Sequence, residues 1–445
     1  MLKLRFLWIG FFLLMGFNFA ALADEDAQII TPSTSASDPA MAGIAARTHM
    51  KVLVPPGGFA KLHREITARP MIGPPSLAAA TAGYETPGSL ACHYGITTPV
   101  ANCPPLSATT TPSGGSRAIA VVLAYHYPNA LKDLTTFSTQ FGIYPVVSGN
   151  STATAAGFKT VYASGTTKAP ANSPNGWELE GAMDLEWAHA MAPQAQLILV
   201  EAQTNSLADL LKAVDVATAQ VVSYGGGQVT MSWGSGEFAA ENTATYENHF
   251  AANPSNPNKL PIVYFASSGD AAGTSWPCVS PNVVCVGGTT LRRSVGSGAF
   301  INEVAWTGSG GGVSTYFTTK PSYQSSLSSV TGRGVPDISL PADPVTGAWV
   351  FYTASNLRAP ATGSWYFVGG TSWSSPTLAG IVNQAQTQTG NFYASSAAAL
   401  TAIYSATNQY TDMQSGWCGY FGGVTSGSGW DMCTGIGTPT GASFK

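Results

Sequence analysis

The stretch from Gly369 to Pro376 reads Gly-Gly-Thr-Ser-Trp-Ser-Ser-Pro and places a serine between a glycine pair and a proline. The glycines allow a tight turn after a strand, and we expect Pro376 in the first turn of the following helix, where its missing N–H costs little. This turn would leave the Ser372 hydroxyl at a helix N-terminus, beside backbone N–H groups that suit a developing oxyanion. The pattern therefore predicts that Ser372 is either a nucleophile or a structural turn residue.

A serine nucleophile needs a base, and no histidine occurs in a motif that would serve this one. None of the six histidines is followed by glycine, as a catalytic His-Gly-Thr segment would require. They are His49, His63, His93, His126, His189 and His249. If Ser372 is a nucleophile, we expect another type of side chain to activate it.

Four acidic residues gather in the segment from Trp177 to Pro193, which predicts a helix that ends before its proline. They are Glu178, Glu180, Asp184 and Glu186, in a chain with only 9% charged residues. Glu180 and Asp184 are four residues apart and share one helix face, where two ionised acids repel each other. A protein keeps such a pair when it is solvated, binds metal or shares a proton. Apolar neighbours argue against a solvated face without excluding it, and Glu178 is the rival of Glu180 as a base.

A third candidate residue follows the apolar run from Leu260 to Ala266, which ends in Ser-Ser-Gly-Asp. The run predicts a buried parallel strand that delivers the Asp270 carboxyl to the C-terminal edge of a sheet. Catalytic groups collect at this edge in open α/β folds. The alternative is that Asp270 only caps the next turn.

Apolar runs alternate with helical patterns along the chain, which predicts an α/β fold with a mainly parallel sheet flanked by helices. A first strand is expected to begin at Ile119. Further strands are expected at 196–200, 229–233, 262–266 and 283–286, with helices near 206–219, 240–251 and 374–389.

Taken together, these segments resemble the sedolisin family of serine-carboxyl peptidases. The matching part runs from about Ala118 to Gly441, and the resemblance implies a subtilisin-like fold. The matching motifs are Glu180-x-x-x-Asp184, Ser232-Trp233-Gly234, Ser268-Gly269-Asp270, Gly369-Gly370-Thr371-Ser372-x-x-x-Pro376 and Gly427-x-Gly429-Trp430-Asp431.

The resemblance implies a secreted, acid-acting serine-carboxyl endopeptidase that cleaves peptide bonds through an acyl-enzyme on Ser372. Glu180 would be the general base, Asp184 would tune it, and Asp270 would donate a hydrogen bond to the oxyanion. Asp270 can donate only while protonated, whereas Glu180 must be ionised to accept a proton, so we expect activity in acid.

Three alternatives stay open. The first is a subtilisin-like neutral serine protease that uses His126 or His189 as the base, and the second is a tripeptidyl-peptidase. The third is an inactive secreted binding protein on the same fold. We expect His189 to be structural and Trp373 to pack on the sheet rather than narrow a pocket.

The resemblance also implies one structural Ca²⁺ in a C-terminal loop. Its ligands would be Asp412, Met413, Gly427, Gly429 and Asp431, through two carboxylates and three backbone carbonyls. The alternative is a glycine-rich surface loop with ordinary turn aspartates. The sequence contains no cysteine and histidine spacing typical of zinc, and no organic cofactor is expected.

Residues 1–23 carry two basic residues, an apolar run and Ala-Leu-Ala, which predicts a signal peptide and a secreted, extracellular or periplasmic protein. Residues 24–85 are expected to be a short prosegment or N-terminal extension, and residues 86–445 the peptidase domain. We expect protein or peptide substrates and a monomer. The net charge of −4 argues against nucleic acid as a partner, and no later stretch suits a stable membrane span.

The six cysteines form three near-neighbour pairs: Cys92 with Cys103, Cys278 with Cys285, and Cys418 with Cys433. In an exported chain, three local disulfides are the simplest interpretation. The alternative is free buried thiols.

Overall fold

A computed structural model describes residues 28–54, 84–173, 176–294, 296–355, 363–419 and 423–445. The predicted signal peptide lies outside the described residues, as do residues 24–27 and 55–83 of the predicted N-terminal extension. Residues 28–54 of that extension are described, and they lie against the main body of the protein.

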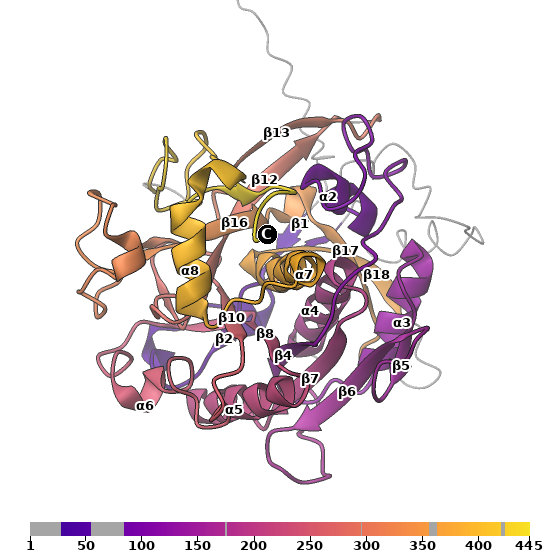
Figure 1. The fold of residues 1–445 in the computed structure, drawn as a ribbon, viewed down its shortest axis with the longest axis horizontal. Coiled ribbons are helices and arrows are strands. Elements are labelled where there is room, and N and C mark those ends of the chain that lie inside the picture. The colour runs from indigo at the N-terminus through magenta and orange to yellow at the C-terminus, as the bar shows by residue number, and fades with distance from the viewer. Residues whose placement is uncertain (1–27, 55–83, 174–175, 295, 356–362, 420–422) are drawn as a thin grey trace, which may run out of the picture.

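A large, mainly parallel sheet forms the centre of the molecule (Figure 1). Across the sheet the strands follow the order β13 (Phe300–Ala305), β12 (Val284–Arg293), β10 (Ile262–Ser267), β8 (Gly227–Met231), β4 (Ala118–Ala124), β7 (Gln196–Ala202), β6 (Ala156–Tyr162) and β5 (Val146–Ser148), and β16 (Ile338–Pro341) also pairs with β12. Only β13 pairs antiparallel among these described strands. Every residue of β4 and β7 is buried, as expected for parallel strands covered on both faces.

Helices cover both faces of this sheet. They are α2 (Pro87–His93), α3 (Ala130–Phe141), α4 (Trp177–Met191), α5 (Leu207–Ser223), α6 (Ala244–Glu247), α7 (Thr371–Thr389) and α8 (Ser396–Ser405). In Figure 1, α4 and α7 lie side by side near the centre, and α5 lies across the β4, β7 and β8 region from them. All fifteen residues of α4 are buried, because α4 is enclosed by the sheet, α7 and α3. The predicted α/β architecture is confirmed.

Two smaller sheets connect the N-terminal segment to the rest of the chain. One has the order β1 (Gln28–Ile30), β3 (Lys51–Val54), β18 (Ser364–Gly369) and β17 (Ala348–Tyr352). The other has the order β11 (Ser275–Trp276), β9 (Trp233–Gly236) and β2 (Arg47–Thr48). All of these pairings are antiparallel. The strand pairs β14 (Gly312–Val313) with β15 (Gly334–Val335) and β19 (Tyr410–Thr411) with β20 (Thr438–Pro439) complete the described sheets. The N-terminal extension is therefore hydrogen-bonded to two elements that flank the predicted nucleophile.

Two local expectations are wrong. The helix α7 begins at Thr371, so Pro376 lies inside it rather than in its first turn. The proline lacks the N–H that would bond the Ser372 carbonyl, and the Ser232 hydroxyl donates to that carbonyl instead, at 3.0 Å. The helix expected at 240–251 is only the short α6, because residues 238–243 form tight turns in which the Glu241 side chain accepts the Phe238 N–H.

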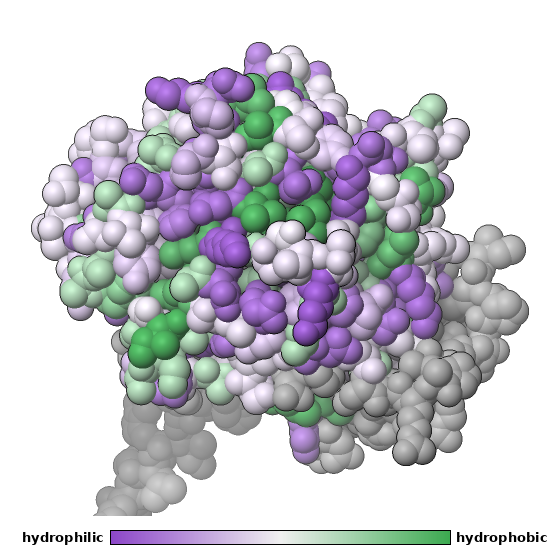
Figure 2. Space-filling model, turned by 90° about the horizontal axis from the view of Figure 1, so that it is seen from below, coloured by the Kyte–Doolittle hydropathy of each residue, from purple (hydrophilic) through white to green (hydrophobic). Residues whose placement is uncertain are grey.

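The three predicted disulfides are confirmed: Cys92–Cys103, Cys278–Cys285 and Cys418–Cys433. Among the described helices, none combines the length and apolar character that crossing a bilayer requires. Figure 2 shows one face of the molecule, on which hydrophilic residues surround small hydrophobic groups.

Candidate active site

Ser372 lies in the first turn of α7 and is fully buried. Gly370 makes the turn from β18 into this helix with a φ of +105°, a conformation that L side chains rarely adopt. The Ser372 hydroxyl donates a hydrogen bond to the Ser232 carbonyl at 3.0 Å and accepts one from the His49 N–H at 2.9 Å. The hydroxyl is therefore held between the start of β9 and the N-terminal segment.

Glu180 and Asp184 lie one turn apart on α4, which packs against α7. Glu180 is 1% exposed and Asp184 is 0% exposed, which excludes the solvated acidic face. Neither carboxyl has a hydrogen-bond partner within 3.5 Å among the described residues. Burial raises the pKa of Glu180 well above its ordinary value, the Asp184 charge raises it further, and the nearby Ser372 hydroxyl opposes the rise. Burial also raises the pKa of Asp184, with Ser232 opposing, so the pair is suited to hold a shared proton.

Asp270 follows β10 and faces the start of α7. Its Oδ1 accepts hydrogen bonds from the Thr371 N–H at 2.8 Å and from the Thr371 hydroxyl at 3.0 Å. Its Oδ2 is buried without a partner among the described residues. Burial raises the pKa of Asp270 to about 7, although the Thr371 hydrogen bonds and the charges of Lys51 and Arg47 oppose the rise. The Asp270 carboxyl is therefore protonated in acid and can donate from Oδ2.

The other acids of α4 point to different partners. Glu178 accepts hydrogen bonds from the Tyr352 hydroxyl at 3.1 Å and from the Ser355 N–H at 3.0 Å. Glu186 accepts the Phe351 N–H at 3.1 Å. Both carboxyls hold the region around β17 against α4, so the geometry favours Glu180 over Glu178 as the base for Ser372.

The two histidines considered as alternative bases are engaged away from Ser372. The His126 Nδ1 lies 2.7 Å from a Glu201 carboxylate oxygen. The His189 Nε2 lies 2.9 Å from the Tyr144 carbonyl oxygen, and burial lowers the pKa of His189 to about 4. His189 is therefore placed as a structural histidine. Trp373 is fully buried and packs edge-on against Trp187, with ring centroids 5.0 Å apart.

Sequence reasoning missed the residue that contacts Ser372 most directly. His49 not only donates its N–H to the serine hydroxyl, but its carbonyl oxygen accepts the Ser372 N–H at 3.1 Å. The two residues are 323 positions apart, and no motif around His49 suggests the contact. The His49 imidazole does not bond Ser372. Its Nδ1 lies 2.7 Å from the Ser267 hydroxyl, and its Nε2 is buried without a hydrogen-bond partner among the described residues.

The predicted calcium ligands share one loop. The Asp412 Oδ2 accepts the Gly429 N–H at 2.8 Å, and the Asp431 Oδ2 accepts the Gly427 N–H at 3.0 Å. The Met413 carbonyl accepts the Ser426 hydroxyl. The Asp412 Oδ1 is buried with no partner among the described residues, a state that fits a cation ligand. Within the same described part of the chain, no group of three or more His, Cys, Asp or Glu side chains could hold a metal ion. Any metal here would therefore depend on backbone carbonyls.

The fold matches a solved structure described as Pseudomonas sedolisin (serine-carboxyl proteinase) complexed with two molecules of pseudo-iodotyrostatin. The TM-score is 0.62 at 24% identity, over 81% of this chain and 96% of that chain. This likeness assigns the fold to the sedolisin type, a subtilisin-like α/β fold. No family model matches the chain.

Curated relatives agree with the fold. Sedolisin of Pseudomonas sp. (strain 101) is 28% identical over 363 residues, which is 74% of this chain and 57% of the relative. Kumamolisin of Bacillus sp. (strain MN-32) is 29% identical over 317 residues, 63% of this chain and 53% of the relative. Tripeptidyl-peptidase 1 of Dictyostelium discoideum is 26% identical over 75% of this chain and 54% of the relative. The chain is thus a homologue of sedolisin and kumamolisin, and it spans a little over half the length of these relatives.

Proposed function

We propose that this chain is a serine peptidase of the serine-carboxyl type that hydrolyses peptide bonds in proteins or peptides. The observation that carries the proposal is the placement of buried carboxyls around Ser372: Asp270 accepts hydrogen bonds from Thr371, and Glu180 lies near the Ser372 hydroxyl with Asp184 one turn further along α4. Each of the three has a raised pKa, and the described histidine side chains make their hydrogen bonds to residues other than Ser372. The relation to sedolisin supports the same chemistry.

In the proposed mechanism, the Ser372 hydroxyl turns from the Ser232 carbonyl toward Glu180 and gives its proton to the ionised Glu180 carboxylate. The serine oxygen attacks the substrate carbonyl, and the tetrahedral oxyanion accepts hydrogen bonds from the Ser372 N–H and from protonated Asp270. Glu180 then gives the proton to the leaving amine. A water repeats the sequence to release the acid product. Asp184 shares the remaining proton with Glu180 and sets its basicity.

The proposed roles of the carboxyls predict that the enzyme is active at acidic pH. Asp270 donates only while it is protonated, and its pKa of about 7 places the loss of this donor near neutrality. A histidine base would instead lose its basicity in acid. We therefore propose an acid-acting enzyme whose activity falls as the pH rises through about 7.

The test is digestion of casein and of a peptide library at about pH 4 and about pH 8, with wild type and Ser372→Ala compared. We expect hydrolysis by wild type at the lower pH alone and none by the variant. Internal cuts would identify an endopeptidase, whereas release of tripeptides from the N-terminus would identify tripeptidyl-peptidase action. No hydrolysis at either pH would contradict the proposal.

We also propose that the loop of Asp412 and Asp431 holds one Ca²⁺, with the carbonyls of Met413, Gly427 and Gly429 as further ligands. The buried, unpartnered Asp412 Oδ1 supports a cation there. An all-oxygen ligand set suits a hard cation such as Ca²⁺, which would stabilise the loop rather than take part in the reaction. The three disulfides support the further proposal that the protein is secreted.

A further inference from the structure

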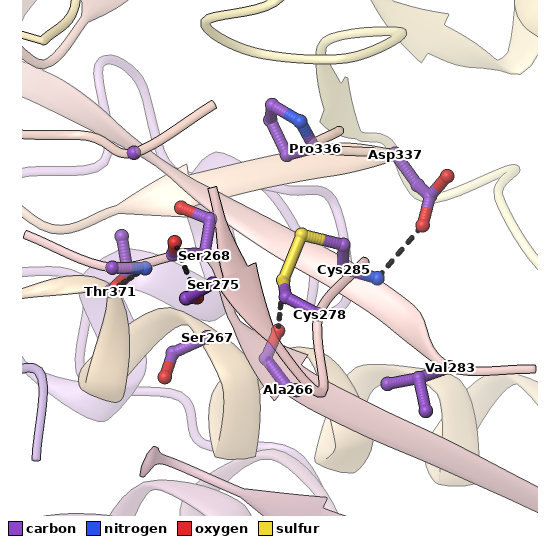
Figure 3. Close-up of a disulfide and its surroundings, with 12 residues drawn as sticks. Ala266, Ser267, Ser268, Ser275, Cys278, Val283, Cys285, Pro336, Asp337 and Thr371 are labelled. Atoms are coloured by element: carbon purple, nitrogen blue, oxygen red, sulfur yellow. Dashed lines mark hydrogen bonds between the residues drawn. A yellow bond between two sulfur atoms is a disulfide. The ribbon is translucent and has the colours of Figure 1, made fainter. Parts of the chain in front are cut away.

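The loop that follows Asp270 is closed by hydrogen bonds between uncharged groups. The Ser275 hydroxyl donates to the Ser268 carbonyl at 2.9 Å and closes the base of the loop (Figure 3). On the outer side, the Gly311 N–H donates to the Gly273 carbonyl at 2.9 Å. Backbone and hydroxyl groups do not titrate in the range where carboxyls do, so these bonds hold the loop at any working pH.

Glu237 attaches the same loop to two other segments through an acidic side chain. Glu237 directly follows β9, and its carboxyl accepts hydrogen bonds from the hydroxyls of Thr274, just before β11, and Ser314, just after β14. It also accepts the Thr315 N–H, at 3.1 and 3.2 Å from its two oxygens. Both Glu237 oxygens thus act as acceptors, as in an ionised carboxylate, and such a group has about four acceptor sites, so one more donor can bind.

A second carboxyl, that of Glu241, is fully buried and lies within hydrogen-bonding range of Glu237. Its Oε2 accepts the Phe238 N–H at 2.8 Å, whereas its Oε1 is buried without a partner among the described residues. Burial first, and then the Glu237 contact, raise the pKa of Glu241 to about 9 against the opposing Phe238 hydrogen bond. Two carboxyls that meet in the interior of a protein are stable together when they share a proton.

The other charged groups around this pair do not neutralise it. Glu247, on the short helix α6, is a further acid whose charge acts on Glu241, and it accepts the Ser280 hydroxyl at 2.7 Å. Arg333 acts favourably on the Glu247 charge but forms its ion pair with Asp337. In the part of the chain that the structure describes, no cationic side chain forms an ion pair with Glu237 or Glu241. A proton is therefore the positive charge that can stabilise the two carboxyls together.

We propose that Glu237 and Glu241 share one proton and that this acid pair is a positioning element for the loop of Asp270. The proton lies on Glu241 Oε1, which donates it to Glu237, and Glu237 in turn holds Thr274. When Glu241 gives up the proton to the solvent, two buried negative charges face each other and the Thr274 attachment is released. The release should occur near pH 9, above the loss of the Asp270 proton near pH 7. The effect on catalysis rests on the proposed function, in which Asp270 is the oxyanion donor.

The first test uses an enzyme in which residue 270 does not titrate. Peptide hydrolysis is measured between about pH 5 and about pH 10 for Asp270→Asn alone and combined with Glu241→Gln, whose amide supplies the donor to Glu237 at every pH. We expect kcat of Asp270→Asn to fall about tenfold as the pH rises through about 9, the effect of one hydrogen bond, with KM little changed, and the combined variant to keep its kcat. Glu247→Gln in place of Glu241→Gln is the matched control and should keep the fall. An equal fall with and without Glu241→Gln would overturn the inference and leave the proposed function standing.

The second test does not depend on activity. Hydrogen exchange of residues 271–275 is compared in the full chain carrying Ser372→Ala, with and without Glu241→Gln, at about pH 7 and about pH 10. Relative to the intrinsic exchange rate, we expect protection to fall about tenfold at the higher pH in Ser372→Ala and to persist when Glu241→Gln is added. The same loss of protection in both forms would overturn the inference. If the expected difference is found but wild type hydrolyses no peptide at any pH, the attachment is supported and the proposed function is overturned.

Discussion

Thr371, at the start of α7, holds Asp270 through two hydrogen bonds to the same carboxylate oxygen. The Thr371 N–H and hydroxyl donate to Oδ1 at 2.8 and 3.0 Å, which leaves Oδ2 on the side of the Gly370 turn. The orientation of the acid is therefore set by the same helix start that carries Ser372. An acid that must donate one hydrogen bond in a fixed direction is suited to the oxyanion role.

The role of Asp270 predicts a distinctive pH effect. Asp270→Ala should lower kcat by about 10²–10³, the usual cost of one oxyanion donor. Asp270→Asn keeps a donor that does not titrate, so its activity should no longer fall as the pH rises through about 7. The measurement is the pH dependence of peptide hydrolysis by the two variants. An unchanged alkaline limb in Asp270→Asn would show that another group controls it.

The carboxyl pair on α4 predicts a second result. Glu180→Gln removes the proton acceptor and should lower kcat by about 10²–10⁴, while Asp184→Asn should lower kcat less and move the acid limb of the pH profile. Glu186→Gln is the matched control, because Glu186 is also buried on α4 but accepts the Phe351 N–H. Equal losses in Glu180→Gln and Glu186→Gln would indicate a loss of folding rather than of a base.

Folding stability should decrease from acid to alkaline pH. Burial raises the pKa of Asp270 to about 7 and that of Glu241 to about 9, so the folded protein retains protons that the unfolded chain has released. Stability that depends on these protons is present below the ordinary carboxyl pKa and is lost as the pH rises through these raised values. Thermal unfolding of Ser372→Ala, which avoids self-digestion, should give a lower Tm at about pH 9 than at about pH 5. A higher Tm at the alkaline pH would contradict these assignments.

His189 should lower the folding stability of the protein at low pH. Its folded-state pKa is lowered to about 4, so the stability that it contributes is present above its ordinary pKa and is lost as the pH falls through about 4. His189→Gln keeps a donor for the Tyr144 carbonyl and does not titrate. Its Tm should therefore fall less than that of the parent between about pH 6 and about pH 3, and an equal fall would refute the assignment.

The calcium proposal predicts that a chelator lowers the Tm. Saturation at about 100 times Kd would contribute about 2.7 kcal/mol to the free energy of unfolding, and chelation would remove it. Asp412→Asn should start from the lower Tm and respond little to the chelator. If the chelator leaves the wild-type Tm unchanged, the loop is held by its own hydrogen bonds, such as that from the Gly427 N–H to Asp431.

The sequence was informative wherever the signal is local. Three features depend only on residues that are close together in the sequence. They are the apolar run of β10, the two acids four residues apart on α4 and the near-neighbour cysteines. These features were enough to predict the parallel sheet and the helix that carries the acids. The place of Pro376 inside α7 was not predictable, because it depends on the Ser232 hydroxyl, 140 residues away from Ser372.

The position of His49 was beyond sequence reasoning for a related reason. Its segment is held by strand pairing with β9 and β18, two elements far along the chain. No sequence pattern around His49 indicates either pairing. Its contact with Ser372 uses backbone atoms, which any residue could supply. The sequence thus predicted a set of candidate catalytic groups and missed the segment that covers them.

We propose that carboxyl groups, not an imidazole, activate Ser372. It is tested most directly by the rate at which a peptide ester acylates Ser372 at about pH 4, followed by mass spectrometry in wild type, Glu180→Gln and His126→Gln. We expect rapid acylation in wild type and His126→Gln and a large loss of the acylation rate in Glu180→Gln. Acylation of Glu180→Gln at the wild-type rate would contradict it.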